Sequence, residues 1–302
     1  MHQPLSAANI LILIIPPLLW AGNAVVGRWV HDLVPPMTLN LLRWVLAFMI
    51  LLPLAWPVLR PASPVWPGWR RYTVLGLLAI GLYNALQYLA LKTSAPMNVT
   101  LVAASSPVWM LGVGWLGFGQ RVSPRQMLGA VLSIAGVAVV LSRGEPAQLA
   151  ALRLVPGDLY VLVATASWAV YSWMLSQPRD PPGLRGDWAA FLMAQLIFGL
   201  GWAGLFAAAE WTLTPAVIHW GWPLALALAY VAIGPAIISY RCFALGVQRV
   251  GPAMAGFFGN LTPLFAALLS AAFLGEPPRL YHGLAFALIV GGIVVSVRRT
   301  RA

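Results

Sequence analysis

The sequence is short of charged residues and of cysteine. Only 8% of its 302 residues are charged, 61% are hydrophobic and the mean hydropathy is +0.83, whereas soluble domains carry about 25% charged residues. This composition excludes an ordinary water-soluble domain. Cys242 is the only cysteine, so a disulfide framework and a thiolate metal cluster are excluded too. We expect neither a metal site nor a cofactor.

Acidic side chains are missing from the middle of every long apolar stretch. All seven Asp and Glu residues fall in connections or at the ends of these stretches, and the four histidines are scattered near the ends as well. Intramembrane catalysis needs paired acids, a nucleophile with its base, or clustered metal ligands. We therefore expect no enzyme. The connections are also too short to form a soluble receptor or scaffold domain.

Ten apolar runs are long enough to cross a hydrocarbon core of roughly 30 Å as α-helices. They cover residues 10–30, 37–57, 72–91, 97–118, 126–142, 157–176, 188–208, 222–244, 252–274 and 281–297. The sequence therefore predicts an all-α integral membrane protein with ten transmembrane helices.

The net charge of +11 could indicate a nucleic-acid partner, but the basic residues are distributed by side of the membrane. If the N-terminus is cytoplasmic, eleven of the eighteen basic residues fall in inner connections and the C-terminal tail, and five fall on the outer side. This asymmetry predicts that both termini are cytoplasmic. The basicity then reflects topology, and no nucleic-acid partner is expected.

The segment 107–143 returns without a gap as 263–299, displaced by 156 positions, so that Pro107 corresponds to Pro263 and Gly136 to Gly292. Each copy contains five spans, and an odd number of crossings inverts the second copy. We predict two inverted five-helix repeats, residues 1–148 and 149–302, around a central cavity. Inverted repeats are typical of secondary transporters. Because no intramembrane acid could relay protons, we expect facilitated transport driven by the substrate gradient.

Two matching prolines, Pro107 and Pro263, lie inside the fourth and ninth spans, where each removes a backbone hydrogen bond and kinks the helix. Interrupted helices at matching positions in two halves indicate a mid-membrane binding site. Ser105 and Asn260 precede the prolines and are polar where lipid would favour leucine. We expect both kinks and these two side chains to border the cavity.

Aromatic residues also occur far from the membrane interfaces. Trp20, Trp109 and Trp168 are central in the first, fourth and sixth spans, and Tyr171 lies one turn from Trp168. Rings at this depth could line a cavity for a planar or apolar side chain. Ordinary helix packing is the alternative interpretation.

Polar side chains inside the spans are costly in lipid and usually face a bundle interior or a wet cavity. Tyr83, Asn84 and Gln87 share the third span, and Asn23 lies in the first. Amides both donate and accept hydrogen bonds, which suits a zwitterion, although they could equally hold helices together.

Two arginines also lie within spans. Arg43, in the second span, either bonds backbone carbonyls or takes part in substrate binding or gating. Arg241, in the eighth span, either lies in the bundle or extends its side chain to the interface.

Short motifs spread over nearly the whole chain accompany the ten duplicated spans. They are Trp20-Ala21-Gly22-Asn23, Arg43, Ala90-Leu91, Pro107, Gly119-Gln120-Arg121, Pro263 and Leu274-Gly275-Glu276-Pro277. Together they resemble the EamA branch of the drug/metabolite transporter superfamily, and within it the chain is most similar to the YddG-type exporters of aromatic and other neutral amino acids. The chain departs from the family at Gly119-Gln120, where a Gly-Glu pair is common, so that glutamate is present only in the second copy.

The resemblance implies export of amino acids from cytoplasm to periplasm by alternating access, in a multi-pass protein of the bacterial inner membrane. We expect a monomer whose partners are a small-molecule substrate and the lipid bilayer. The residues predicted to bind substrate are Trp20, Asn23, Arg43, Tyr83, Asn84, Gln87, Ser105, Trp109, Trp168, Tyr171 and Asn260. The alternative is efflux of drugs or other hydrophobic or cationic metabolites, which aromatic rings would attract through cation–π contacts.

Overall fold

The computed structural model describes residues 3–90, 93–94, 96–151, 153, 155–274 and 279–297, and every regular element in these residues is a helix. The first half contains α1 (Ala7–Trp29), α2 (Pro36–Ala55), η1 (Trp56–Leu59), α3 (Trp69–Gly76), η2 (Leu77–Leu82), α4 (Tyr83–Ala90), α5 (Pro96–Ala103), α6 (Ser106–Phe118), α7 (Pro124–Leu141) and α8 (Pro146–Ala150). The second contains α9 (Pro156–Ser176), α10 (Pro182–Gly186), α11 (Trp188–Leu213), α12 (Trp222–Val231), η3 (Ala232–Ile238), α13 (Ser239–Val250), α14 (Pro252–Gly259), α15 (Thr262–Leu274) and α16 (Leu280–Ser296).

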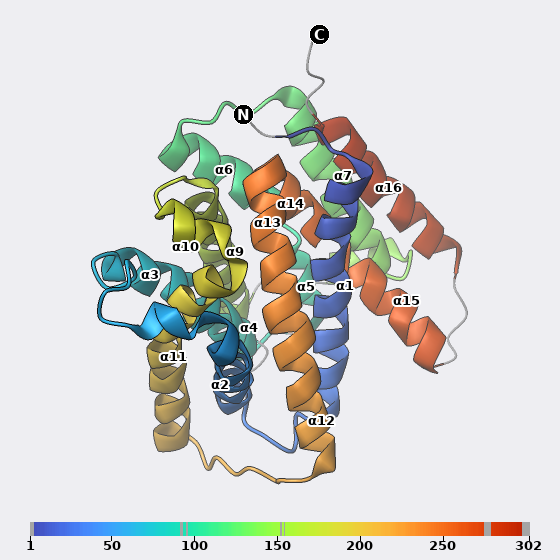
Figure 1. Ribbon diagram of the computed structural model, residues 1–302. Coiled ribbons are helices and arrows are strands. Elements are labelled where there is room, and N and C mark those ends of the chain that lie inside the picture. The colour runs from blue at the N-terminus through green and yellow to red at the C-terminus, as the bar shows by residue number, and fades with distance from the viewer. Residues whose placement is uncertain are drawn as a thin grey trace.

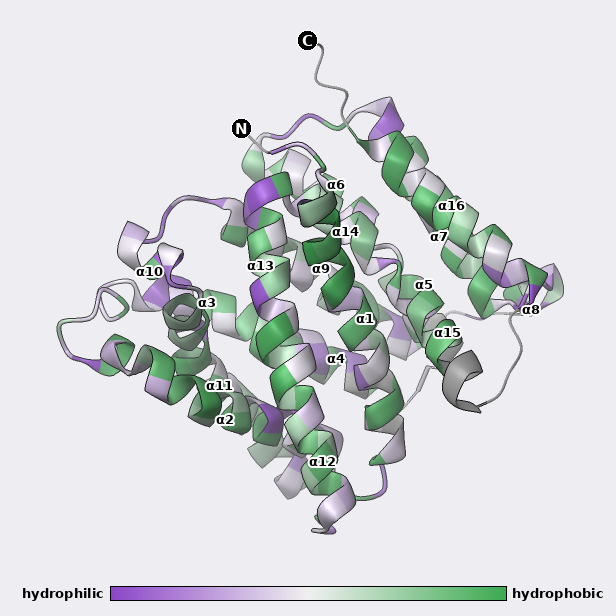
Figure 2. Ribbon diagram, turned by 45° about the vertical axis from the view of Figure 1, so that its right-hand side comes forward, coloured by the Kyte–Doolittle hydropathy of each residue, from purple (hydrophilic) through white to green (hydrophobic). Residues whose placement is uncertain are grey.

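The helices form an all-helical membrane bundle, as the sequence predicts. Seven helical segments among the described residues are long and apolar enough to cross a bilayer, and α16 is a shorter apolar helix. In Figure 1, α1 begins and α16 ends at the same end of the bundle, at the top of the view. Figure 2 shows hydrophobic residues along the long helices and hydrophilic ones concentrated in the connections. The motif residues 275–277 lie outside the described residues.

Helix starts follow local sequence. The N-terminus of α7 carries a capping box, because Ser123 accepts a hydrogen bond from the backbone N–H of Gln126 and the Gln126 side chain accepts one from the N–H of Ser123. The start of α2 is capped by another helix. Glu210 of α11 is buried and accepts hydrogen bonds from the backbone N–H groups of Met37, at 3.1 Å, and Thr38, at 2.9 Å. A carboxylate at a helix N-terminus is favoured by the helix dipole.

The fourth and ninth predicted spans are broken helices. α5 ends at Ala103 and α6 begins at Ser106, while α14 ends at Gly259 and α15 begins at Thr262. The two interruptions are therefore displaced by the same 156 positions as the sequence repeat. Pro107 and Pro263 are not in the middle of a kinked helix; each is the second residue of the following helix, where its missing N–H would have had no partner.

Two other spans contain a π-helical segment that the sequence does not predict. η2 joins α3 to α4 in the first half, and η3 joins α12 to α13 at the corresponding place in the second. π-helical segments widen the turn, weaken the regular hydrogen-bond pattern and often occur at functional sites. Both halves therefore place irregular backbone near mid-span.

The contact between α7 and α16 shows how the two halves are related. A Cβ atom added to Gly129 would lie 2.6 Å from the carbonyl oxygen of Gly292, and one added to Gly136 would lie 2.9 Å from that of Ala285. Gly292 is the counterpart of Gly136, and Ala285 is the counterpart of Gly129. This reciprocal pairing makes the helices antiparallel and relates them by a pseudo-two-fold axis, as inverted repeats require. Both ribbon views show α7 and α16 side by side (Figures 1 and 2).

The boundary predicted between residues 148 and 149 falls inside α8, in the connection between the halves. That boundary stays a prediction.

Candidate functional site

Trp168 of α9 lies in the middle of a group of aromatic rings contributed by both halves of the chain. The distances from its ring centroid are 5.5 Å to Trp20, 4.8 Å to Tyr83, 5.1 Å to Tyr171, 5.7 Å to Tyr240 and 4.8 Å to Phe243. Trp44 of α2 extends the group, with its ring 4.9 Å from that of Tyr240. We call these seven residues the aromatic cluster. Such offset and edge-to-face contacts are the favoured geometries for aromatic rings.

Helical spacing brings the rings together. Trp168 and Tyr171 are three residues apart on α9, and Tyr240 and Phe243 are three residues apart on α13, so each pair lies on one face of its helix. α1 and α4 add Trp20 and Tyr83 from the first half. The structure therefore brings four of the predicted aromatic residues together.

The polar atoms of the cluster bind the π-helical segments. The Tyr240 hydroxyl donates to the carbonyl oxygen of Ala79 in η2 at 2.9 Å, and the Trp20 indole N–H donates to that of Pro235 in η3 at 3.2 Å. Carbonyls in irregular helix need partners from side chains inside a membrane protein. The cluster thus connects the irregular backbone of each half to the other half.

Arg43 is a buried cation at the edge of this cluster. Its Nη2 donates to Asn40 Oδ1 at 2.7 Å, and the Asn40 amide in turn donates to the carbonyl oxygen of Ile80 in η2 at 3.1 Å. The side chain is 4% exposed, and its Nε has no hydrogen-bond partner in the described structure. The guanidinium carbon of Arg43 lies 5.1 Å from the centroid of the Trp44 ring, and Asn84 lies beside the Tyr240 side chain. No described carboxylate forms an ion pair with Arg43, and a buried guanidinium normally requires an anion.

The predicted amides lie against the tyrosines. Asn84 is beside Tyr240, and Gln87 is beside Tyr83. A third amide was not among the predicted site residues: Gln195 of α11 accepts a hydrogen bond from the Tyr171 hydroxyl at 3.0 Å. The sequence could have identified Gln195 as a polar side chain inside an otherwise apolar span.

A cavity of about 380 Å³ leads to the cluster from one end of the bundle. Its inner part is lined by Tyr171, Gln195 and Tyr240, and its outer part by side chains of α10, α11 and α13. The backbone N–H of Gln3 donates to the carbonyl oxygen of Arg249 at 2.7 Å, so the end of α13 that borders the cavity lies beside the N-terminus. A cavity of this size falls in the range of small-molecule sites.

An ion cluster borders the mouth of this cavity. The Asp180 carboxylate accepts from Arg71 Nε at 2.7 Å and from Arg71 Nη2 at 2.9 Å, and Arg185 Nη1 lies 3.5 Å from it. Burial lowers the pKa of the Arg185 guanidinium, while the charge of Asp180 opposes that shift. Because Arg71 is in the first half and Asp180 in the second, this cluster joins the two halves at that end.

The structure places the remaining predicted residues outside the cluster. Asn260 is buried between the broken helices, where its Nδ2 donates to the carbonyl oxygen of Ala104 at 3.0 Å and to Ser133 Oγ at 2.9 Å. Ser105 Oγ donates to the carbonyl oxygen of Val102, three residues earlier in the chain. Trp109 is half-buried against the core, and half-buried Asn23 forms no side-chain hydrogen bond to a described residue. Their roles in substrate binding stay predictions.

Comparison with known proteins gives a consistent picture at the level of the family. The model of the EamA-like transporter family matches residues 7–142 and again residues 155–298. Relatives include the aromatic amino acid exporter YddG of Ancylobacter novellus, 27% identical over 81% of this chain and 79% of that protein. The uncharacterized transporter YyaM of Bacillus subtilis is 24% identical over 74% of this chain and 72% of its own length. The uncharacterized inner membrane transporter YedA of Escherichia coli K12 is 24% identical over 92% and 87%.

These identities fall in a narrow range, so they do not single out the YddG-type exporters as the nearest group. Among the solved structures that match, one crystal structure has a TM-score of 0.75 and 25% identity, over 98% of this chain and 99% of that chain. With one family model matched in both halves and the fold shared over nearly the full length, the protein belongs to the EamA-like transporter family.

Proposed function

We propose that this transporter exports amino acids, with aromatic and other neutral amino acids as its substrates. The observation that supports this most is the aromatic cluster around Trp168 with the buried guanidinium of Arg43 at its edge, whose Nε has no hydrogen-bond partner among the described residues. A neutral amino acid needs hydrogen-bond acceptors for its ammonium, a cation for its carboxylate and a suitable surface for its side chain. Arg43 would bind the carboxylate, amide oxygens of Asn84 and Gln87 the ammonium, and the rings the side chain.

One relative, YddG of Ancylobacter novellus, is named an aromatic amino acid exporter, which favours the same class of substrate. Because both halves of one chain contribute rings to the cluster, we infer that a monomer contains the complete site. The cavity opens towards the end of the bundle where the N-terminus lies. Substrate would enter there and leave at the opposite end after the two halves rearrange, driven by its own gradient.

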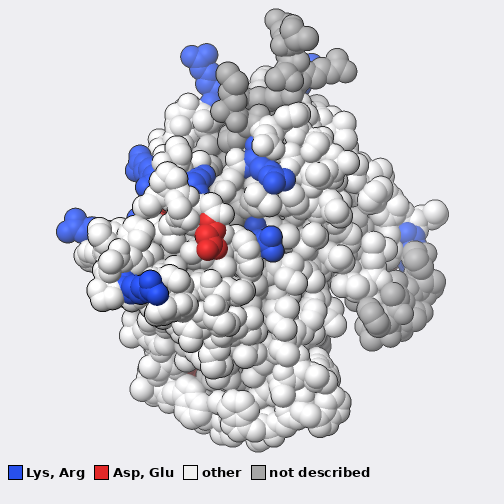
Figure 3. Space-filling model, viewed as in Figure 1, with Lys and Arg blue, Asp and Glu red and all other residues white. Residues whose placement is uncertain are grey.

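We place the protein in the bacterial inner membrane with both termini in the cytoplasm. On the face that Figure 3 draws, basic side chains lie mainly towards the end where α1 begins and few charges are visible at the opposite end, a distribution that supports this orientation under the positive-inside rule. Alkaline phosphatase fused within the connection 214–221 should be active, and the same enzyme fused to the C-terminus should be inactive. The reverse pattern would contradict this orientation.

The substrate proposal is tested with the purified protein in proteoliposomes loaded with labelled amino acids. We expect saturable flux of tryptophan, phenylalanine, threonine or methionine, and none from empty liposomes. Saturable flux of an unrelated solute without any flux of these four would refute the proposal.

The aromatic cluster also favours a second candidate, efflux of hydrophobic cations, through cation–π contacts. The positive charge of Arg43 beside the cluster argues against it, because a cation would be repelled there. Raised drug resistance in cells that overexpress the protein, without amino-acid flux, would support this second function.

A further inference from the structure

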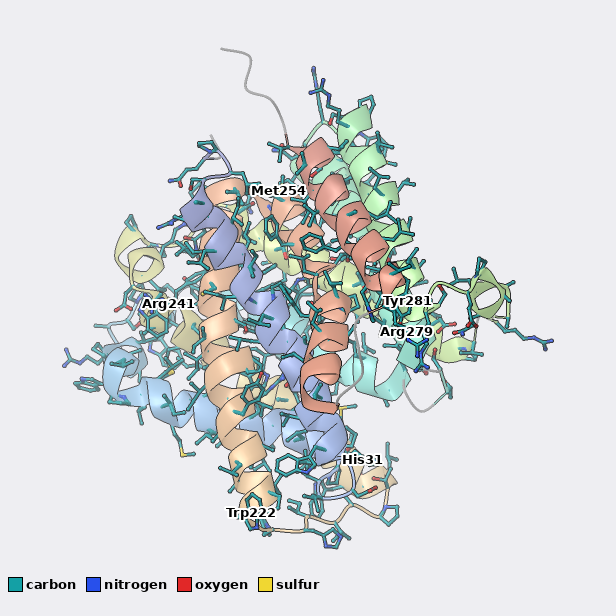
Figure 4. All side chains as sticks on the ribbon, turned by 90° about the vertical axis from the view of Figure 1, so that its right-hand side faces the viewer. His31, Trp222, Arg241, Met254, Arg279 and Tyr281 are labelled. Carbon is teal, nitrogen blue, oxygen red and sulfur yellow. The ribbon has the colours of Figure 1, made fainter. Side chains whose placement is uncertain are left out.

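Arg241 of α13 lines the outer part of the cavity and is held by a single aromatic contact. Its guanidinium carbon lies 4.4 Å from the ring centroid of Trp188, the first residue of α11. Among the described residues, Arg241 forms no hydrogen bond and no ion pair, and its side chain is exposed. Figure 4 shows Arg241 on the side of α13 away from α1. The sequence left open whether this arginine lies in the bundle or extends to the membrane interface; in the structure it lines the cavity.

The other cation that lines the cavity, Arg185, already has partners within the protein. Arg185 lies 3.5 Å from the Asp180 carboxylate and donates to the carbonyl oxygens of Gln177 and Leu175. Arg241 therefore has guanidinium donors available to a ligand, whereas those of Arg185 hold the connection between α9 and α11 in place. The contact with Trp188 limits the movement of the guanidinium, which favours binding of a carboxylate at this position.

The rest of the cavity suits a ligand with an anionic and an aromatic end. Its lining residues include no Asp or Glu, and its inner part consists of Tyr171, Gln195 and Tyr240. A solute whose carboxylate binds Arg241 could extend its side chain towards these residues. Beyond them, the deeper cation Arg43 lies over the Trp44 ring, whose centroid is 4.9 Å from that of Tyr240.

We propose that Arg241 and Trp188 form a carboxylate site near the mouth of the cavity, where a solute binds before it moves to the aromatic cluster. We call it the outer site. This inference rests on the proposed amino-acid export and adds a second, earlier binding step to it. The ligand class is a carboxylate with an aromatic or apolar side chain, and the positive charge of Arg241 is the feature that selects it.

The test compares three variants of the full chain in proteoliposomes: Arg241→Gln, Arg241→Lys and Arg60→Gln. Arg60 is the matched control, because it is exposed and its guanidinium carbon lies 4.2 Å from the Trp56 ring, yet it does not line the cavity. Tryptophan flux gives KM and kcat. Inhibition by indole-3-propionate, which lacks the amine, and by tryptamine, which lacks the carboxylate, separates the two charged groups.

We expect Arg241→Gln to raise the KM for tryptophan roughly three- to tenfold with little change in kcat, and to weaken inhibition by indole-3-propionate to the same extent. Inhibition by tryptamine should not weaken, Arg241→Lys should give an intermediate KM, and Arg60→Gln should match the wild type. The effect should shrink when salt is raised from about 0.05 M to about 0.5 M, since Arg241 is exposed.

Equal KM values for Arg241→Gln and Arg60→Gln at low salt would overturn the outer site while amino-acid export stands. An equal loss of inhibition by tryptamine and by indole-3-propionate would also overturn it. If the wild type carries no amino acid, the export proposal and the outer site both fail.

Discussion

Asn260 donates a hydrogen bond to the carbonyl oxygen of Ala104, the residue that occupies the same position in the first half of the chain. The two residues lie 156 positions apart, at the interruptions of the two broken helices. A second bond from the Asn260 amide reaches Ser133 Oγ on α7. At this junction between the repeats, the second copy donates through an asparagine side chain. The first copy accepts through the backbone carbonyl of an alanine.

We expect Asn260→Ala to lower stability by about 1–3 kcal/mol, because it leaves the buried Ala104 carbonyl and Ser133 hydroxyl without this partner. Flux of all substrates should fall together. Thermal unfolding in detergent and transport assays measure the two effects, and Asn23→Ala, which removes no side-chain hydrogen bond to a described residue, should leave the Tm unchanged. A normal Tm with loss of one substrate alone would instead indicate that Asn260 binds substrate.

Removal of the central ring should change selectivity. Trp168→Ala should lower kcat/KM for tryptophan and phenylalanine roughly fivefold more than for threonine, because each aromatic contact contributes about 0.5–1.5 kcal/mol. Trp168→Phe keeps an aromatic ring, so it should have a smaller effect, and it controls for a folding defect in Trp168→Ala. Trp115→Ala is the control, since that side chain is 63% exposed on α6. An equal loss for all amino acids would mean that Trp168 only packs the bundle.

The charge of Arg43 should decide whether carboxylates bind. Arg43→Gln should weaken tryptophan binding at least about tenfold, because a buried charge-assisted contact is lost, while Arg43→Lys should retain part of it. Binding of labelled tryptophan to the purified protein measures this. Arg70→Gln, which removes an exposed arginine 5.6 Å from the Trp69 ring, should have no effect. Unchanged affinity in Arg43→Gln would assign Arg43 to helix packing.

Substitution by alanine should affect stability differently at two adjacent glycines of α16. Gly292→Ala would place a Cβ 2.6 Å from the backbone oxygen of Gly129, so we expect a loss of about 1–3 kcal/mol and a lower Tm. Gly291 has no atom within 4 Å of an added Cβ, and Gly291→Ala should be neutral or stabilising by up to about 1 kcal/mol. Similar Tm values for the two variants would contradict the close α7–α16 contact.

The architecture was predictable because a lipid environment restricts the backbone structures that the chain can adopt. Backbone groups in a bilayer must bond internally, so long apolar runs become helices, and the repeat of Pro107 at Pro263 located both interruptions to within a few residues. The π-helical segments were not predictable in this way. They change the turn of a helix without changing its hydropathy, and η2 contains no proline that would indicate it.

The candidate site was predictable only in part. Sequence gives the depth of Trp168 or Tyr240 along a helix, but not which neighbouring helix each faces. For that reason Trp44, Tyr240 and Phe243 were not predicted, although Tyr240 and Phe243 have the spacing of one helical face. The sequence also showed that burying Asn260 is costly, but not that Ala104 and Ser133 would satisfy its amide.

The reciprocal glycine contact between α7 and α16 has a consequence for the origin of the chain. Gly129 meets the counterpart of Gly136, and Gly136 meets the counterpart of Gly129, which is the contact pattern of an isologous interface. Two separate copies of one half-length polypeptide, inserted in opposite directions, would form the same interface. The fused chain thus preserves the geometry of a dual-topology homodimer, and co-expression of its two halves as separate polypeptides offers a direct way to reassemble it.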